Sequence, residues 1–400
     1  MARKIMRGDN MKKGIVVLLI IFLTVFILTA CDSPTDELAP EPEKKIEDVI
    51  TPEDKEDGEL IDETEDREQE KLAETENDRD NLASENIEDD RSDRDSSVVM
   101  EEDQQIAYLS PFTGQPIEEI KRERAIMASI ENTQPARPQS GLEDADIVYE
   151  FLVEGGITRF LALYWGKIPD KIGPVRSVRP YLIRTSQDYH ALLLHAGASP
   201  AGFALLQQEN VFHLDQIYNG SYYWRSSDRK APHNLYTGGD IVKPYLRNIT
   251  GQKYTSRFNF QNVSLINPAQ IKANKISINY WGDNRLLYKY NEDRNIYLRY
   301  YSKYNIPHMT DTGGRLKTRN IIVQYVKTEV IDEQGRLEME LEGRNKALVF
   351  KDGIVISGYW EKNNDEWARY YDETGNEIEL NPGKTWIEVV PLSCRVEYEE

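Results

Sequence analysis

Apolar residues recur in short runs, separated by glycine, proline and polar residues, over the last three quarters of the chain. Arg124–Ile130, Ile147–Val153 and Ile157–Trp165 are rich in β-branched and aromatic residues, which predicts strands. Gly155 and Gly156, between the last two runs, predict a tight hairpin turn.

Helical signals follow these strands. Arg179–Tyr189 carries a proline at the second position, which is typical of a helix first turn, and Ser199 can cap a helix that runs through Gln208. Ala191–His195 between them predicts a short buried strand. The alternation of strands and helices predicts an α/β-type N-terminal domain with a mixed sheet over residues 106–250.

The pattern changes after about residue 256. Short strand-like runs continue to about residue 395, and turns such as Asp332–Gly335, Lys351–Gly353 and Asp372–Gly375 separate several of them. We therefore predict the α+β class: the α/β-type domain followed by a smaller, mostly β C-terminal domain over residues 256–395.

The N-terminus is typical of a lipoprotein signal. Basic residues precede an apolar run of 14 residues, Ile15–Leu28, which is shorter than the roughly 20 residues of a membrane span. Leu28-Thr29-Ala30-Cys31 resembles the bacterial lipobox, so we predict a signal peptide over residues 1–30 and a lipid on Cys31 that anchors the exported chain to the outer face of the cytoplasmic membrane. An uncleaved anchor helix is the alternative, and either Met1 or Met11 can be the start.

The segment over residues 31–105 predicts a disordered acidic tether. Residues 32–103 contain 31 acidic and 8 basic side chains, a net charge of −23, and no aromatic residue. Residues 1–31 carry +4, so the total of −20 leaves −1 for the chain from Gln104 onward. A self-repelling segment of this length reaches about 50 Å or more. It can serve as a stalk or, alternatively, as a docking segment for a basic partner.

Arginines near glycine and proline turns predict an anion site. A guanidinium donates two parallel hydrogen bonds to a phosphate or carboxylate. The predicted ligand-binding residues are Arg137, Arg159, Arg176, Arg179, Arg229 and Asn234. Arg184 is a further arginine of this arginine-rich group. The alternative is that these arginines pair internally with Glu150, Glu154 and Asp188.

Catalysis is left open by the sequence. Glu150, Glu154, His195 and His233 are weak candidates for acid and base roles. Ser199 resembles half of a nucleophile elbow, but a helix cap fits Pro200 better. Phosphate-loop, dinucleotide and zinc-protease motifs are absent, so no cofactor, metal site or nucleic-acid partner is predicted.

Several strings resemble the YerB-type family of bacterial lipoproteins, whose activity is unassigned. They are Ala136–Leu142, Ala145–Glu150, Glu154–Arg159, Ile172–Arg179, His195–Ser199, Ala231–Tyr236 and Asn381–Ile387. The resemblance covers roughly Pro111 to Pro391 and implies a lipid-anchored envelope protein with an N-terminal domain and a smaller C-terminal domain. It supplies no catalytic residues.

These observations predict an exported lipoprotein that binds a phosphate-bearing or otherwise anionic envelope ligand. One alternative is a protein-binding scaffold at the cell surface. Another is a phosphotransferase or hydrolase acting on lipid-linked wall precursors, because the Gly-Gly-x-x-Arg strand followed by an arginine turn is similar to the LytR-CpsA-Psr family. Thr158-Arg159 and Val175-Arg176-Ser177 stand where that family has Arg-Ser-Asp-Thr and Pro-Arg-Asp-Thr, so the acid that would hold a metal is missing.

Overall fold

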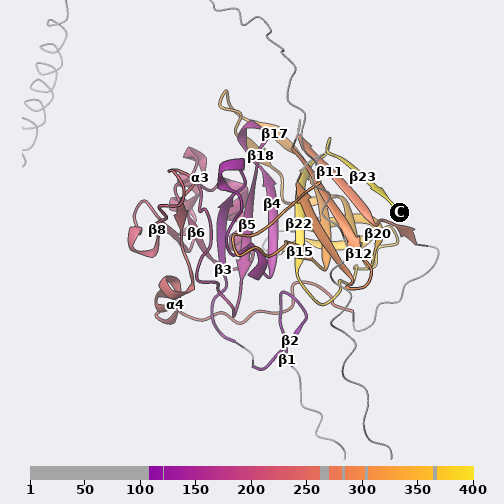
Figure 1. The fold of residues 1–400 in the computed structure, drawn as a ribbon, viewed down its shortest axis with the longest axis horizontal. Helices are drawn as coiled ribbons and strands as arrows, with labels where there is room; N and C mark the ends of the chain where they lie inside the picture. The colour runs from indigo at the N-terminus through magenta and orange to yellow at the C-terminus, as the bar shows by residue number, and fades with distance from the viewer. Residues whose placement is uncertain (1–107, 120, 262–269, 282–283, 302–304, 364–366) are drawn as a thin grey trace, which may run out of the picture. The chain divides into compact units, whose positions relative to one another are not determined.

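The computed structural model describes residues 108–119, 121–261, 270–281, 284–301, 305–363 and 367–400 (Figure 1). The expected signal peptide, Cys31 and the acidic tether lie outside the described residues. None of the helices within the described ranges is long and apolar enough to cross a membrane. The described residues all belong to one compact unit.

An eleven-stranded mixed sheet is the centre of this unit, and both halves of the described chain contribute to it. In spatial order its strands are β10 (Ile271–Lys272), β20 (Ile354–Lys362), β19 (Gly343–Lys351), β16 (Asn320–Val326), β22 (Thr385–Pro391), β4 (Ile147–Leu152), β5 (Thr158–Tyr164), β3 (Ile126–Glu131), β6 (Leu192–His195) and β7 (His213–Asp215), with β21 (Arg369–Asp372) also paired to β20. Strands β3, β4, β5, β16 and β22 are buried along their whole length, which explains their nearly continuous apolar sequences.

Seven strands of this sheet run in the same direction, and one of them is β20, which is antiparallel to β19 as β19 is to β16. β16, β22 and β4 pair in parallel, and so do β3, β6 and β7, while β5 is antiparallel to both β4 and β3. Their C-terminal ends therefore lie along one edge of the sheet, which we call the carboxyl edge. The start of β5 lies at the same edge.

A second sheet packs on one face of the main sheet. Its strands are β14 (Ile306–Pro307), β13 (Ile296–Tyr301), β12 (Asn284–Asn291), β11 (Lys275–Trp281) and β23 (Arg395–Glu399), and β15 (Lys317–Thr318) pairs with β13. The rings of Tyr288 and Trp386 meet edge to face across the two sheets, with centroids 6.5 Å apart.

Helices cover the other face of the main sheet. Helix α2 (Pro180–Asp188) places Tyr181 against Phe151 of β4, with ring centroids 5.5 Å apart. Helix α3 (Pro200–Gln208) packs beside α2, and Ser199 caps it by accepting a hydrogen bond from the Gly202 amide at 3.1 Å. Helix α4 (Gly239–Arg247) follows the β8–β9 pair. Figure 1 shows the helices gathered at the β6 end of the main sheet.

Short elements complete the fold. They are the pairs β1 (Tyr108–Leu109) with β2 (Pro116–Ile117), β8 (Trp224–Arg225) with β9 (Leu235–Tyr236), and β17 (Thr328–Val330) with β18 (Leu337–Met339), and the 3-10 turns Gln134–Ala136, Leu142–Asp144, Glu154–Gly156 and Gly220–Tyr222. The Glu154–Gly156 turn joins β4 to β5 at the predicted hairpin, and both of its glycines have φ near +71°, where glycine is favoured.

The structure confirms a strand-rich fold with mixed sheets. Strands from both sides of the predicted domain boundary near residue 250 join in one sheet and share one apolar core. The boundary itself stays a prediction. Helix α4 was not predicted. Pro244 lies inside it, and a proline within a helical pattern hides the helix from a sequence-based assignment.

Candidate functional site

Two polar clusters lie on opposite faces of the main sheet. Glu150 and Glu388 pair in register on β4 and β22, beneath the second sheet. Phe160 of β5 pairs in register with Glu150 and so faces the second sheet. Arg159 precedes Phe160 and pairs in register with Glu131 of β3, so Arg159 and Glu131 point to the opposite, helical face. We call the first group the sealed network and the second the open cluster.

The sealed network is built around an ion pair between Glu150 and Arg299. Both side chains are at most 2% exposed, and they contact each other through Glu150 Oε2 and Arg299 Nη2. The other carboxylate oxygen accepts hydrogen bonds from Thr158 Oγ1 at 2.5 Å and Asn132 Nδ2 at 3.2 Å. This pair ties the N-terminal half of the described chain to the second sheet.

Glu388 is the second carboxyl group of the sealed network. Tyr280 and Tyr288 donate hydrogen bonds to its two oxygens at 2.7 and 2.5 Å. Burial, and then the nearby negative charge of Glu150, raise the pKa of Glu388 to about 8. Glu388 therefore holds a proton at neutral pH, and Arg299 balances the single charge of Glu150.

His308 completes the sealed network in its neutral form. Arg299 Nη1 lies 2.6 Å from His308 Nδ1, and a guanidinium can only donate, so Nδ1 accepts and Nε2 carries the proton. Nε2 then donates to Gln139 Oε1 at 2.9 Å. Burial and the neighbouring charge of Arg299 lower the pKa of His308.

The open cluster lies at the carboxyl edge, on the helical face, and is partly exposed. It consists of Glu131, Glu154, Arg159, Arg176, Arg179 and His233, together with Ser177. Arg179 pairs with Glu154 through two parallel hydrogen bonds of 2.5 and 2.7 Å. This pair lowers the pKa of Glu154 against the opposing effect of its burial.

Glu131 holds the other side of the open cluster. Its carboxylate lies 3.1 Å from Arg176 Nε and 2.9 Å from His233 Nδ1. Glu131 is 3% exposed, whereas Arg176 and His233 are 29% and 24% exposed. The loop that carries His233 therefore reaches the arginine turn through a shared carboxylate.

Arg159 differs from its neighbours because no carboxylate contacts it. It is 6% exposed, and its Nη1 donates to the Ser177 carbonyl at 2.6 Å. Among the described residues no atom accepts a hydrogen bond from its buried Nε. Burial, followed by the positive charge of Arg179, lowers the pKa of Arg159 to about 10. Three arginines face two glutamates, which leaves one positive charge in excess.

Helices α2 and α3 begin side by side at the open cluster. Arg179 is the N-cap of α2, and the segments that lead into the two helices run in parallel and pair at Val178 and Ala198. Both helices are nine residues long. Helix N-termini carry a partial positive charge and free N–H groups, so they add to the excess charge of the arginines.

The remaining predicted ligand-binding residues lie outside the open cluster. Arg137 stacks on Tyr301, with its guanidinium 3.6 Å from the ring centroid, and contacts Asn132. Arg229 donates to the carbonyls of Ala136 and Pro138, at 2.7 and 2.5 Å, and so holds the loop that carries Arg137. Arg225 donates to Asn234 at 2.8 Å. Arg184 lies on the exposed side of α2, 3.6 Å from Glu209.

Some expected internal ion pairs are present and others are replaced. Glu154 pairs with Arg179 as expected, whereas Glu150 pairs with Arg299 and Asp188 with Lys362, both from the C-terminal half. The sequence analysis missed Arg299, His308 and Glu388. Glu388 interrupts an apolar strand, as Glu150 does, so the same signal could have identified it.

The weak catalytic candidates are all engaged in internal contacts. His195 is fully buried, its Nδ1 donates to the Gly197 carbonyl at 3.0 Å, and its Nε2 accepts from His213 at 2.9 Å. Burial lowers the pKa of His195 to about 4, so the ring is neutral. Ser199 caps α3. The described residues contain no group of three or more histidine, cysteine, aspartate or glutamate side chains arranged to hold a metal ion.

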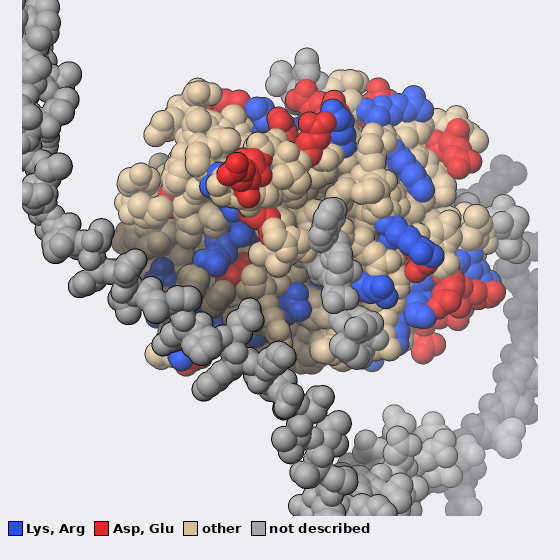
Figure 2. Space-filling view, turned by 90° about the horizontal axis from the view of Figure 1, so that it is seen from above, with Lys and Arg blue, Asp and Glu red and all other residues tan. Residues whose placement is uncertain are grey.

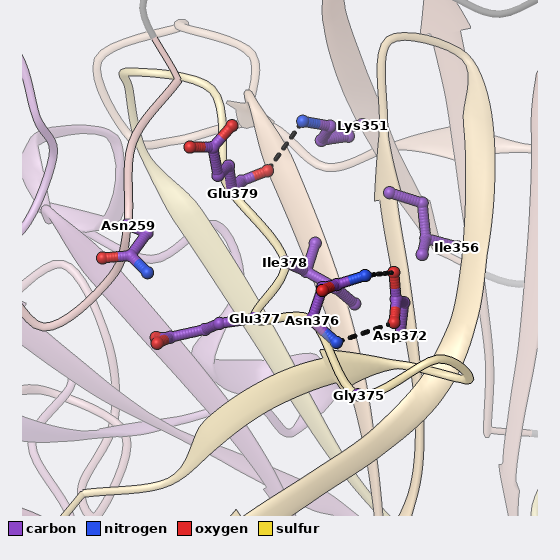
Figure 3. Close-up of a pocket in the computed structure, with 9 residues that line it drawn as sticks. All are labelled: Asn259, Lys351, Ile356, Asp372, Gly375, Asn376, Glu377, Ile378 and Glu379. Carbon is purple, nitrogen blue, oxygen red and sulfur yellow. Dashed lines mark hydrogen bonds between the residues drawn. The ribbon is translucent and has the colours of Figure 1, made fainter.

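A cavity of about 670 Å³ lies at the turn that follows β21 and shares no lining residue with the open cluster (Figure 3). Its lining includes Asp372, Glu377, Glu379 and Lys351. Asp372 is occupied by Asn376 and Thr374, and Lys351 donates to the Glu379 carbonyl at 2.6 Å. These contacts close a hairpin turn, so we do not place the function there.

The surface charge of the body is mixed. Figure 2 shows Lys and Arg interspersed with Asp and Glu over the visible face. This pattern matches the near-neutral charge of the chain from Gln104 onward.

Two family models match the chain in succession. The model described as the protein of unknown function (DUF3048) N-terminal domain matches residues 112–253, and that of the corresponding C-terminal domain matches residues 276–387. The chain belongs to this family. The open cluster lies within the N-terminal match, and the sealed network joins residues of both matches.

A curated relative and a solved structure agree with this assignment. The chain is 35% identical over 291 residues to the putative lipoprotein YerB of Bacillus subtilis (strain 168), an alignment that covers 70% of this chain and 86% of the relative. It is also similar to the crystal structure of the YerB protein from Bacillus subtilis, with a TM-score of 0.65 and 29% identity over 72% of this chain and 99% of that chain. The predicted resemblance to the YerB-type family is confirmed.

Proposed function

We propose that this protein is an exported lipoprotein, anchored through Cys31, that binds an anionic envelope ligand at the open cluster. The lipobox-like Leu28–Cys31 string and the name of the Bacillus subtilis relative support the anchor. The contacts of Arg159 support the ligand. The ligand chemistry is a phosphate or carboxylate group, because both match the fork of a guanidinium.

The buried, unpaired guanidinium of Arg159 carries this proposal. A charge removed from water without a counter-ion is costly, and structural arginines normally escape that cost by pairing with a carboxylate. Arg179 and Arg176 are paired in this way, whereas the hydrogen-bond acceptors of Arg159 within the described part of the chain are the carbonyl and hydroxyl groups of Ser177. An anion beside Arg159 would supply the missing charge.

The position of the cluster in the sheet supports the same function. Glu131 at the end of β3 and Arg159 at the start of β5 meet at the carboxyl edge. Ligands of open α/β sheets commonly bind outside the carboxyl ends of the strands. The starts of α2 and α3 at this edge favour a negatively charged group.

Titration calorimetry with inorganic pyrophosphate tests the proposal on residues 32–400, which keep the tether and the body. We expect saturable binding that weakens at least tenfold in Arg159→Gln and in Arg176→Ala. Arg184→Ala is the matched control, because Arg184 is 51% exposed on α2 and outside the cluster. Absence of binding, or an equal loss in the control, would contradict the proposal.

Native mass spectrometry of the protein purified from its own envelope gives an independent test. A co-purifying phosphorylated lipid or wall fragment that is lost in Arg176→Ala would identify the ligand. A clean mass with another protein retained would instead favour a scaffold function and leave the arginines as structural ion pairs.

A further inference from the structure

Two large apolar side chains are exposed next to the open cluster. Ile217 is 58% exposed and Tyr218 is 77% exposed, and both follow β7 at the carboxyl edge. Single exposed apolar residues are common on protein surfaces. These two are adjacent in sequence, and Ile217 reaches the backbone of the arginine turn through Gly197, which gives them a specific context.

The fold fixes Ile217 close to the arginine turn. Asp215 Oδ1 accepts hydrogen bonds from the amides of Gly197 and Ile217, at 2.8 and 3.1 Å, and so holds the two residues together. Gly197 has no side chain to intervene, since a Cβ built on it would already lie 3.4 Å from Ile217 Cδ1.

The same Gly197 contacts the arginine turn from its other side. Its carbonyl accepts from the Val178 amide at 3.0 Å, and Ala196 N–H donates to the Arg176 carbonyl at 3.1 Å. Ser177, between these two positions, accepts from Arg159. Ile217 therefore lies against Gly197, and Gly197 is hydrogen-bonded to Val178, the residue after Ser177, whose carbonyl accepts from Arg159.

We infer that the ligand of the open cluster is amphiphilic, with an anionic head group that binds Arg159 and Arg176 and an apolar chain that lies over Ile217 and Tyr218. This inference rests on the proposed anion site and names the class of ligand that the site takes. A purely polar anion would use the arginines and leave the apolar pair in water, whereas an apolar chain covers both side chains and gains from their burial.

A pair of probes separates the head group from the chain. Inorganic phosphate and hexyl phosphate, kept below the concentration at which it aggregates, are titrated into residues 32–400. We expect hexyl phosphate to bind at least tenfold more tightly, because it adds apolar contact to the same head group. In the Ile217→Ser/Tyr218→Ser double variant this advantage should fall to within about twofold of inorganic phosphate.

Matched controls distinguish the outcomes. Ile271 of β10 is 59% exposed at the far end of the sheet order, so Ile271→Ser should keep the full advantage of hexyl phosphate. Inorganic phosphate should bind the double variant and the wild-type protein equally, which also shows that the variant is folded. Equal affinity for the two probes, or an advantage that survives in the double variant, would overturn the amphiphile inference and leave the anion site in place. Failure of both probes to bind would overturn the proposed function itself.

Discussion

The sealed network and the open cluster use similar residues on opposite faces of one sheet, yet their charges are balanced differently. In the sealed network the charges of Glu150 and Arg299 cancel, because Glu388 is protonated and His308 is neutral. Almost every polar atom of this network has a partner. In the open cluster the charges do not cancel, and Arg159 is buried without a carboxylate. The difference is why we assign a structural role to the sealed network and propose an anion site at the open cluster.

The largest expected effect concerns the sealed network. Arg299→Met leaves Glu150 buried without its counter-ion, and we expect it to lower the free energy of unfolding by about 3–5 kcal/mol. Urea denaturation of residues 32–400 measures this. Arg395→Ala is the control, because Arg395 is 76% exposed in its pair with Glu397 and should change stability by less than about 1 kcal/mol. Similar small losses in both variants would show that the sealed network is not what joins the two halves.

A smaller effect concerns the proton on Glu388. Its pKa is raised from 4.5 to about 8 in the folded protein, so between these values the folded state binds a proton that the unfolded state releases. The contribution of Glu388 to the free energy of unfolding is therefore fully present below pH 4.5 and is lost as the pH rises toward 8. Glu388→Gln removes this dependence, and the loss of stability between pH 5 and pH 8 should shrink by about 1–3 kcal/mol.

Urea denaturation at several pH values separates this effect from others. Burial also raises the pKa of Asp146 to about 7 and that of Asp188 to about 6, so both proteins should still lose some stability as the pH rises. Those contributions are common to the wild-type protein and Glu388→Gln, and only their difference reports on Glu388. An unchanged slope would mean that Glu388 is already ionised at neutral pH.

The sequence predicted the strands well because runs of β-branched and aromatic residues are a local signal. It could not predict that β22 would pair with β4, since this parallel pairing links residues more than 200 positions apart without any local pattern. The same limit applies to the sites. Arg159, Arg176 and Arg179 are close in sequence and were predicted together, whereas Arg299 reaches Glu150 only through the packing of two sheets. Which arginine of the open cluster lacks a carboxylate became visible only with the contacts.

The smallest expected effect sharpens the comparison most directly. Arg159→Met removes a buried charge, but it leaves no carboxylate unpaired and relieves the repulsion from Arg176 and Arg179. We therefore expect a change of less than about 1 kcal/mol in the free energy of unfolding without ligand, in contrast to Arg299→Met. With inorganic pyrophosphate at 100 times its Kd for the wild-type protein, the wild-type protein should gain about 2.7 kcal/mol, and Arg159→Met, binding at least tenfold more weakly, about 1.4 kcal/mol or less. Urea denaturation with and without pyrophosphate measures both numbers. A loss in Arg159→Met as large as that in Arg299→Met would show that Arg159 is a structural residue like Arg299, and the distinction between the two clusters would fail.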